Sequence, residues 1–384
     1  MSMKKLVLAV AVTGLFASTV GAQELVVKIG HVGPMTGGIA HLGKDNENGA
    51  KLAIKDLNAK GVMIGGQKAK FELLSEDDGA DPKQGTAAAQ KLVDAKVNGV
   101  IGHLNSGTTI PASKIYLDAG IPQISPSATN PKYTRQGFKT AFRLVADDVA
   151  LGGTLGRYAV NDVKGKSIAG IDDRTAYGQG VSDEFEKAVK ASGGNLVGRE
   201  FTNDKATDFQ AILTKLKAKK PDVVFFGGMD AVAGPMLKQM KTLGIGAKFI
   251  GGDGICSETL VKLAGDGMVD GQVVCAEAGG VEGGKKKGMD EFKAHFKAEF
   301  NSEVQFYAPY VYDAVMVMVE AMKKAGSAEP AKYLAVLPSV TYDGITGKIA
   351  FDQKGDLKNG SLTLYTYKAG KRDELKVVQA SASK

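Results

Sequence analysis

Short apolar runs alternate with amphipathic stretches along most of this chain. The first series begins with an apolar run over residues 25–33, a helical pattern over 43–61 and a second apolar run over 70–78. Apolar positions recur every three to four residues in the helical pattern, whereas the shorter runs are rich in consecutive apolar residues. Strands of that kind are typical of parallel sheets whose two faces are covered by helices. The alternation therefore predicts an α/β fold built from βαβ units.

The same alternation restarts after residue 148 and predicts a second lobe. From a helical pattern at 150–162 to an apolar run at 271–279, strands and helices follow one another again. A chain of 384 residues also exceeds what one hydrophobic core usually covers. Residues 347–378 alternate apolar and polar positions around glycine-rich turns, which predicts an antiparallel hairpin. The expected fold class is therefore α/β, with two doubly wound parallel-sheet lobes.

The first 22 residues have the pattern of a secretory signal peptide. Two lysines precede an apolar stretch over residues 6–17 that is too short to span a membrane, and small residues follow up to Ala22. No cysteine follows the expected cleavage site after Ala22, so we expect no lipid anchor. No later apolar run reaches the ~20 residues that a spanning helix needs. The mature protein is therefore expected to be exported and soluble.

Charge and cysteine content argue against several classes of function. The net charge is +7, but the basic residues are spread along the chain, and the densest run, Lys285 to Lys287, is typical of a solvated surface. Nucleic-acid binding therefore finds little support.

The sequence has two cysteines, Cys256 and Cys275. In an oxidising compartment they can form a disulfide; the alternative is two buried thiols that pack as small apolar side chains. Neither cysteine has histidines near it, so we expect no metal site and no catalytic Cys–His pair.

Two neighbouring predicted strands end in small hydroxyl residues. The hydroxyl residues after the two strands are Ser106, Thr108, Thr109, Ser127 and Thr129. One such residue is an ordinary helix N-cap, but five are more than two caps require. A helix N-terminus favours an anion such as a carboxylate, and ligands of open parallel sheets bind outside the carboxyl ends of the strands. These hydroxyls are therefore candidates for binding a carboxylate.

The second lobe offers the opposite charge. Asp253 lies in the sequence Gly-Gly-Asp-Gly at a predicted strand end, where its carboxylate can pair with an ammonium group, and Tyr177 follows another strand end. Hydroxyl donors on the first lobe and a carboxylate on the second suit a zwitterion, which has both a carboxylate and an ammonium group. Each residue also has a simpler interpretation: Ser106, Thr129 and Asp253 can be helix caps, and Tyr177 can be half-buried packing.

Several stretches of this chain resemble one known family. They are residues 28–62, 77–93, 100–134, 173–180 and 351–360. Together they resemble type I periplasmic solute-binding proteins of the branched-chain amino-acid ABC transporter family. The resemblance covers nearly the whole mature chain and is more specific for the family than for the ligand.

The resemblance implies two lobes joined by a hinge of three chain crossings. The expected first lobe comprises residues 23–146 and 277–363, and the second comprises 147–276 and 364–378, with a disordered tail at 379–384. It also implies roles for individual residues. Ser106 and Thr129 would hold the ligand carboxylate with help from the main chain of Ser127, and Asp253 would hold the ammonium together with Thr129. Tyr177 and Tyr307 would flank the ligand, and Leu42 and Met229 would line its side-chain pocket.

This sequence departs from the family at several of these positions. The acid of the Gly-Gly-Asp-Gly segment is often Glu in the family, so Asp253 is one methylene shorter. Leu42 and Met229 stand where some leucine-binding members have aromatic residues. The usual early disulfide of the family is absent, because Ala80 and Asn105 occupy its positions. The departures leave the preferred ligand side chain open.

The resemblance implies the binding component of an ABC importer in the periplasm. It would clamp a free amino acid, branched-chain or aliphatic, and deliver it in a transient complex to a membrane permease. We expect a monomer without cofactor or metal. A sensor that presents its ligand to a membrane receptor, or a binder of small amides or carboxylic acids, is the alternative. We do not expect an enzyme, because no Gly-x-Ser-x-Gly, Walker or dinucleotide motif is present and a structural role suits His103 best.

Overall fold

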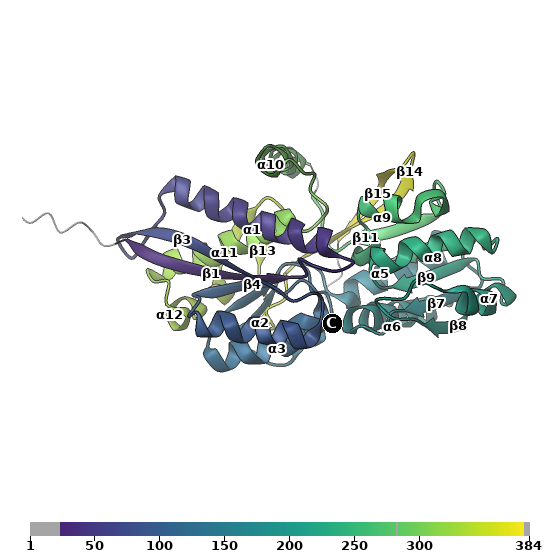
Figure 1. The fold of residues 1–384 in the computed structure, drawn as a ribbon, viewed down its shortest axis with the longest axis horizontal. Coiled ribbons are helices and arrows are strands. Elements are labelled where there is room, and N and C mark those ends of the chain that lie inside the picture. The colour runs from purple at the N-terminus through teal and green to yellow at the C-terminus, as the bar shows by residue number, and fades with distance from the viewer. Residues whose placement is uncertain (1–23, 282, 380–384) are drawn as a thin grey trace, which may run out of the picture.

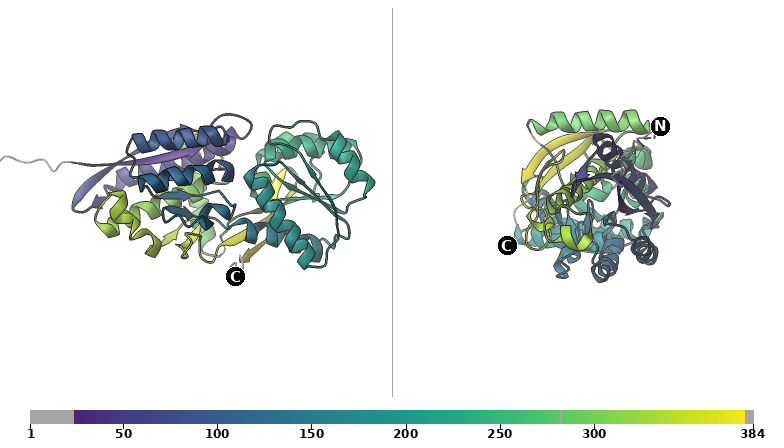
Figure 2. Two further views of the ribbon diagram at one scale, coloured as in Figure 1. Left: turned by 90° about the horizontal axis from the view of Figure 1, so that it is seen from below. Right: turned by 90° about the vertical axis from the view of Figure 1, so that its left-hand side faces the viewer.

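The computed structural model describes residues 24–281 and 283–379, which form two lobes placed end to end along the long axis (Figures 1 and 2). Each lobe has a predominantly parallel sheet covered by helices, as the apolar pattern predicted. The expected signal peptide at residues 1–22 and the end of the expected tail, residues 380–384, lie outside the described ranges. None of the described helices is both long and apolar enough to cross a membrane.

The first lobe is built on a six-stranded sheet in the order β2-β3-β1-β4-β5-β6. All neighbouring strands are parallel except the short β2, which is antiparallel to β3. Its strands are β1 (Leu25–Gly33), β2 (Met63–Ile64), β3 (Gln67–Asp77), β4 (Gly99–Gly102), β5 (Gln123–Ser125) and β6 (Ala141–Arg143). Its longer helices are α1 (Ala40–Lys60), α2 (Pro82–Asp94), α3 (Ser106–Ala119), α10 (Lys285–Phe300) and α11 (Ala308–Ala325). The shorter elements are α4 (Lys132–Arg135), α12 (Pro330–Leu334), the 3₁₀ turn η3 (Leu337–Ser339) and the hairpin of β12 (Thr341–Gly344) and β13 (Gly347–Ala350).

The second lobe is built on a seven-stranded sheet in the order β15-β14-β11-β10-β9-β7-β8. Its strands are β7 (Ile168–Asp172), β8 (Leu196–Phe201), β9 (Val223–Gly227), β10 (Lys248–Gly251), β11 (Val273–Glu277), β14 (Ser361–Lys368) and β15 (Lys371–Gln379). Its helices are α5 (Asp148–Asn161), α6 (Ala176–Ala191), α7 (Gln210–Ala218), α8 (Asp230–Thr242) and α9 (Thr259–Ala264), with 3₁₀ turns η1 (Asp253–Ile255) and η2 (Gly265–Gly267). Strands β14 and β15 pair antiparallel, which confirms the predicted hairpin from residue 361 onward. Residues 347–350, at the start of the predicted range, instead form β13 and pair with β12.

The chain passes between the lobes three times, after β6, after β11 and before β14. The expected lobe boundaries stay a prediction, but sheet membership differs from them at three points. Glu277 ends β11 and residues 361–363 begin β14, so both belong to the second sheet. Gln379, expected in the tail, is the last residue of β15 and pairs with Ser361.

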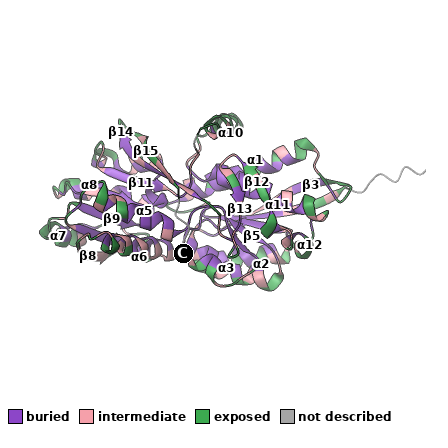
Figure 3. Cartoon of the chain, turned by 180° about the vertical axis from the view of Figure 1, so that it is seen from behind, coloured by how far each residue is buried: buried purple, intermediate pink, exposed green. Residues whose placement is uncertain are grey.

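Local sequence signals explain where several helices begin and end. Asp81 caps α2, since its side chain accepts hydrogen bonds from the backbone N–H groups of Lys83 and Gln84, and Pro82 occupies the first helical position. Gly61 ends α1 in a left-handed conformation with φ 61°, which a glycine adopts without steric cost. The cores follow the strands: in Figure 3 the buried residues lie along both sheets and the exposed residues on the outer helix faces.

The disulfide between Cys256 and Cys275 is present, so the alternative of two free thiols is wrong. It joins the residue after η1 to the middle of β11, and both cysteines are fully buried. Asp253 is the first residue of η1, so the crosslink attaches the turn that contains this carboxylate to the sheet.

Candidate functional site

The carboxyl ends of β4 and β5 lie side by side and are joined by Ser106. Ser106 is the first residue of α3, after Asn105 as the N-cap. Its hydroxyl accepts a hydrogen bond from the backbone N–H of Asn130 at 3.1 Å, so it connects the two strand ends. The side chain is 1% exposed. Ser106 therefore lies at a helix N-terminus, as predicted, on the lobe edge where parallel sheets bind ligands.

The other hydroxyls of this edge differ in what they contact. Thr108 and Thr109 donate to the carbonyl of Asn105 at 3.1 and 2.8 Å, so they serve the start of their own helix. Ser127 donates to the carbonyl of Leu104 at 3.0 Å. The hydroxyl of Thr129 is fully buried and has no hydrogen-bond partner of normal geometry within residues 24–281 and 283–379. Thr129 therefore differs from the other hydroxyls of this edge, and it lies beside the carboxylate of Asp148.

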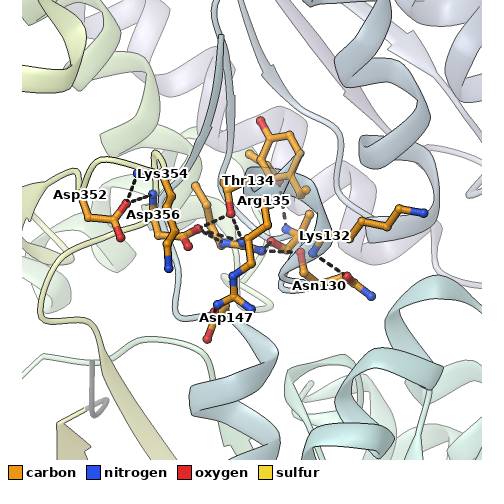
Figure 4. A network of polar contacts seen from close by, with 12 residues as sticks. Asn130, Lys132, Thr134, Arg135, Asp147, Asp352, Lys354 and Asp356 are labelled. Atoms are coloured by element: carbon orange, nitrogen blue, oxygen red, sulfur yellow. Dashed lines mark hydrogen bonds and ion pairs between the residues drawn. The ribbon is translucent and has the colours of Figure 1, made fainter. Parts of the chain in front are cut away.

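A buried arginine fixes the backbone that carries these residues. Arg143, at the end of β6, donates to the carbonyls of Ala128 and Asn130, each at 2.9 Å. Figure 4 shows Asn130, Thr134 and Asp356 of this polar network. Its guanidinium also donates to Asp356 at 2.8 and 2.9 Å and to Thr134 at 2.7 Å. Asp356 lies in the loop after β13, within one of the stretches that carry the family resemblance. That loop thus holds the 128–130 segment in place from the hinge side.

In the second lobe, Asp253 accepts hydrogen bonds from two tyrosines of different lobes. The hydroxyl of Tyr177, at the start of α6, donates to Asp253 Oδ1 at 2.7 Å. The hydroxyl of Tyr307, just before α11 of the first lobe, donates to Asp253 Oδ2 at 2.9 Å. The three residues are all at least 94% buried, with 6, 3 and 2% exposure for Tyr177, Asp253 and Tyr307. The structure therefore brings together three residues that the sequence places far apart.

Burial raises the pKa of the Asp253 carboxyl to about 6, and the hydrogen bonds from the Tyr177 and Tyr307 hydroxyls act in the opposite direction. The same burial, together with the charge of Asp253, raises the pKa of both tyrosines well above the usual value. Above about pH 6 the arrangement is therefore a carboxylate with two neutral phenol donors.

Tyr307 is held in position by a residue that the sequence analysis did not single out. Asp45, buried in α1, accepts hydrogen bonds from four consecutive backbone N–H groups at the start of α11, at 2.8 to 3.1 Å. These N–H groups belong to residues 305–308. Four otherwise unpaired donors are thus satisfied by one carboxylate from another helix, which fixes the backbone of Tyr307.

A second buried acid, Asp148, was also missed. It is the first residue of α5 and fully buried, and neither carboxylate oxygen has a hydrogen-bond partner of normal geometry in the described part of the chain. Burial raises its pKa well above the usual value, the hydroxyl of Thr129 beside it acts in the opposite direction, and the charge of Asp253 raises the pKa further. A signal existed in the sequence: Asp147 already caps the helix through the N–H of Ala150, so a second consecutive Asp is not needed for capping.

The apolar residues expected around the ligand belong to one cluster that spans both lobes. Leu42, Tyr177, Met229 and Tyr307 are all members of the same group of contacting buried side chains. Gly254 leaves room for them: a Cβ at this position would lie 2.6 Å from Met229 Sδ and 2.9 Å from a ring carbon of Tyr177. Glycine is therefore required here by the close approach of its neighbours.

Other notable groups lie away from these residues. A cavity of about 740 Å³ is lined by residues of α9, α10, α11, β14 and β15, and contains none of the predicted site residues.

His103 is fully buried inside the first lobe. Its two ring nitrogens lie at hydrogen-bond distance from Asp78, at 3.1 Å, and from the Tyr116 hydroxyl, at 3.0 Å. Within residues 24–281 and 283–379 no group of three or more His, Cys, Asp or Glu side chains could hold a metal ion.

The sequence matches the family described as "Periplasmic binding protein" over residues 26–372. This chain belongs to that family. The family is a solute-binding type, as the resemblance implied, and its two-lobed α/β fold agrees with the sheets described above.

Relatives with named ligands are similar to almost the whole chain. It is 35% identical over 376 residues to a leucine-, isoleucine-, valine-, threonine- and alanine-binding protein of Pseudomonas aeruginosa, covering 97% of this chain and 98% of the relative. A branched-chain amino acid transporter substrate-binding protein of Streptococcus pneumoniae, solved with isoleucine, has a TM-score of 0.83 and 27% identity, covering 92 and 99% of the chains. A solute-binding protein of an ABC transporter from Rhodopseudomonas palustris, solved with 3,4-dihydroxybenzoic acid, has a TM-score of 0.79 and 26% identity, covering 92 and 98%.

Proposed function

We propose that this protein is the substrate-binding component of an ABC importer and clamps a free amino acid between its lobes. The observation that carries the proposal is the buried carboxylate of Asp253, which accepts from one tyrosine of each lobe. A carboxylate in this position suits a ligand ammonium group, because charge-assisted hydrogen bonds are strong in a site that excludes water. The names of the relatives support an amino acid as that ligand.

The first lobe supplies the complementary half of the site. The N-terminus of α3 with Ser106, and the hydroxyl of Thr129, suit the ligand carboxylate. The main chain of Ser127 directly precedes the 128–130 segment that Arg143 fixes, and adds further polar groups. Asp148 lies near both Thr129 and Asp253, so we assign it to the ammonium side of the ligand.

The side-chain pocket favours aliphatic amino acids. Leu42, Met229 and Tyr307 present apolar surface from both lobes. Pockets of this kind separate ligands that differ by one methylene by only ~1–3 kcal/mol, so we expect several branched-chain amino acids to bind. The wide ligand range in the name of the Pseudomonas relative agrees with this expectation.

We further propose that the protein works as a monomer in the periplasm and contacts its permease transiently. The family description and the transporter names of the relatives support this partner. The signal-like pattern of the first 22 residues supports export. Opening and closing of two lobes about a hinge is the established motion of periplasmic binding proteins, and the three chain crossings provide such a hinge here.

Calorimetry and thermal unfolding with a panel of amino acids test the proposal. A ligand at 100 times its Kd should stabilise the protein by ~2.7 kcal/mol. Asp253→Asn should weaken binding by a factor of about 30 or more, because one partner of a buried charge pair is lost. Asp266→Asn, a change at an 80% exposed acid of the same lobe, is the matched control and should leave the affinity unchanged. If no amino acid stabilises the wild-type protein, the proposal is wrong.

A carboxylic acid without an ammonium group is the second candidate. The observation that favours it is that burial raises the pKa of Asp148 well above the usual value and that of Asp253 to about 6, since an acid that is protonated below its pKa can donate to a ligand carboxylate. The structural relative solved with 3,4-dihydroxybenzoic acid is an example of such a ligand in this fold. Under this alternative Asp253→Asn keeps its affinity, because an amide can also donate, whereas an amino acid requires the carboxylate.

A further inference from the structure

A carboxamide of the first lobe reaches directly to the second lobe. Asn130 Nδ2 donates to the carbonyl of Ala176 at 2.7 Å. Ala176 is the first residue of α6 and directly precedes Tyr177, whose hydroxyl donates to Asp253. Asn130 itself directly follows Thr129 in the first lobe. This hydrogen bond therefore connects the two segments that we assign to opposite ends of the ligand.

Every other polar group of Asn130 is engaged within the first lobe. Its backbone N–H donates to the Ser106 hydroxyl at 3.1 Å, and its carbonyl accepts from Arg143 at 2.9 Å. Its Oδ1 accepts from the backbone N–H of Lys132 at 2.9 Å, in a turn that Figure 4 shows. Because Oδ1 serves that turn, the NH2 group of the amide is the part that faces the second lobe. An aspartate would keep the turn but could not donate to the other lobe.

The second lobe provides space for this amide at Gly180. Gly180 lies four residues after Ala176, so both are on the same face of α6. A Cβ at Gly180 would lie 2.5 Å from Asn130 Nδ2 and 2.7 Å from Asp148 Oδ2. Contacts this short force a neighbouring group to shift. The glycine therefore makes room for the amide of the other lobe and for the buried acid of its own.

A second polar contact joins the lobes between other helices. His41 Nε2, in the first turn of α1, lies 2.7 Å from Asp230 Oδ2, at the first residue of α8. Their sequence neighbours Leu42 and Met229 belong to the apolar cluster that spans the lobes. This contact lies beside the proposed side-chain pocket, whereas the contact of Asn130 lies beside the groups for the ligand backbone. Loss of the Asn130 amide should therefore weaken closure and not abolish it.

We propose that Asn130 is a positioning residue that couples the two lobes around the ligand; this inference rests on the proposed function. Its backbone belongs to the edge that holds the ligand carboxylate, and its side chain fixes the start of α6, which carries Tyr177. A ligand favours one arrangement of the lobes through contacts that the other arrangement lacks. The hydrogen bond from Asn130 to Ala176 is such a contact, because neither lobe can make it alone. Asn130 need not touch the ligand.

Asn130→Asp tests the proposal, because it keeps the acceptor for Lys132 but places an oxygen opposite the carbonyl of Ala176. We expect the Kd of L-leucine, measured by calorimetry, to rise by about tenfold, because two oxygens then face each other in place of a hydrogen bond. Faster release should account for the rise, since the groups of the first lobe that meet the ligand are unchanged. The chain contains no tryptophan, so release is followed with radiolabelled L-leucine diluted into an excess of unlabelled ligand.

Asn203→Asp is the matched control. Asn203 is exposed in the second lobe, and its Oδ1 accepts from the backbone N–H of Lys205 at 2.9 Å, in the same kind of turn. The substitution adds the same charge and keeps the turn, but removes no hydrogen bond between the lobes. Kd and release should therefore stay as in wild type. Unfolding temperatures without ligand establish that each variant folds.

Gly180→Ala tests the same contact from the second lobe. The added methyl group should weaken L-leucine binding, because it occupies the space of the Asn130 amide. In an Asn130→Ala background this part of the effect should disappear, whereas any effect through Asp148 remains. The rise in Kd of the double variant should therefore be smaller than the product of the two single rises.

The outcomes separate the role of Asn130 from the function on which it rests. If wild-type protein does not bind L-leucine, the proposed function fails and this inference fails with it. If wild-type protein binds and Asn130→Asp keeps the wild-type Kd and release, the role of Asn130 alone is overturned. Slower association with unchanged release would overturn it as well, since closure would then be normal. Should Asn130→Asp not fold, the double variant decides: a rise in Kd equal to the product of the single rises overturns the proposal.

Discussion

At the scale of single residues, the environment of Asp253 determines when it is charged. Its pKa is raised to about 6 by burial, and two phenol donors limit the rise. Asp253 must be ionised to attract an ammonium group, so amino-acid affinity should fall as pH decreases through about 6. Burial thus sets the acid limit of binding, and the two tyrosines lower that limit without changing their own charge.

Tyr307→Phe tests that relation. Removing one donor destabilises the carboxylate, so the pKa of Asp253 rises further and the pH at which binding weakens moves up by about one unit. The pH dependence of Kd measured by calorimetry gives the shift. Tyr312→Phe is the control, since this hydroxyl on the same helix donates to Asp56 at 2.8 Å and not to Asp253. An unchanged profile in Tyr307→Phe would contradict the hydrogen bond between Tyr307 and Asp253.

His31 makes the free energy of unfolding decrease as the pH falls, whereas a histidine paired with a carboxylate makes it decrease as the pH rises. It is fully buried in β1, and burial lowers its pKa to about 4, below the ~6.5 of the unfolded chain. The unfolded state therefore takes up a proton first, and stability is lost as pH falls from about 6.5 towards 4.

For His31→Gln, the free energy of unfolding relative to wild type should rise by ~2.5 kcal/mol between pH 7 and pH 4.5. Urea unfolding at the two pH values measures this difference. In the exposed control His295→Gln the difference from wild type should stay constant. A constant difference in His31→Gln as well would show that the buried imidazole is not the group responsible.

At the scale of elements, the loop after β13 supports the binding edge of the first lobe. Asp356 holds the fully buried Arg143, which in turn holds the carbonyls of Ala128 and Asn130. Asp356→Ala leaves a buried guanidinium without its carboxylate and should cost about 3 kcal/mol of unfolding free energy. Urea unfolding measures the loss, and Lys354→Ala, an exposed position in the same loop, should cost little. Equal costs in the two variants would rule out this role for Asp356.

The disulfide acts at the same scale, because it attaches η1 to β11. Crosslinking residues 19 positions apart restricts the unfolded chain and is worth ~3 kcal/mol. Replacing Cys256 and Cys275 together with serine should lower the free energy of unfolding by about that amount. Thiol titration of denatured, unreduced wild-type protein should find no free thiol, whereas two free thiols would contradict the bond.

At the scale of the whole molecule, polar contacts hold the lobes together around the proposed site. Asn130 of the first lobe donates to the carbonyl of Ala176 in the second at 2.7 Å, and Thr259 of the second donates to Gln305 of the first at 2.9 Å. We expect L-leucine to reduce the radius of gyration measured by small-angle scattering, since closure brings these groups together. Asp253→Asn should show no decrease at the same ligand concentration. A wild-type radius that ligand does not change would contradict closure.

The sequence predicted those features that depend on local pattern. Alternating apolar runs predicted the two parallel-sheet lobes, and the turn-rich pattern predicted the terminal hairpin of β14 and β15, because both depend on residues that are near neighbours in the chain. Ser106 was correctly placed at the start of a helix.

Features that depend on the folded arrangement could not be predicted in this way. Asp45 meets residues 260 positions or more away, and His41 meets Asp230 at a separation of 189. Neither pairing can be recognised from the periodicity or the composition of the sequence. Asp148 could be suspected only from the second consecutive Asp at a helix start, whereas its burial without partners of normal geometry depends on the folded arrangement. Arg143 was equally inconspicuous, since its partner Asp356 lies 213 residues further along.

The threefold passage of the chain between the lobes also bears on how the protein is made. The first lobe is incomplete until α11 and Asp356 have been synthesised, which happens late in the chain. The second lobe is incomplete until β14, the neighbour of β11, has been made near the end of the described chain. A growing chain therefore cannot complete either lobe early, because the contacts that close both are among the most distant in sequence. A chain exported as proposed should therefore remain without its tertiary structure while it passes through an export channel, and should fold only on the far side.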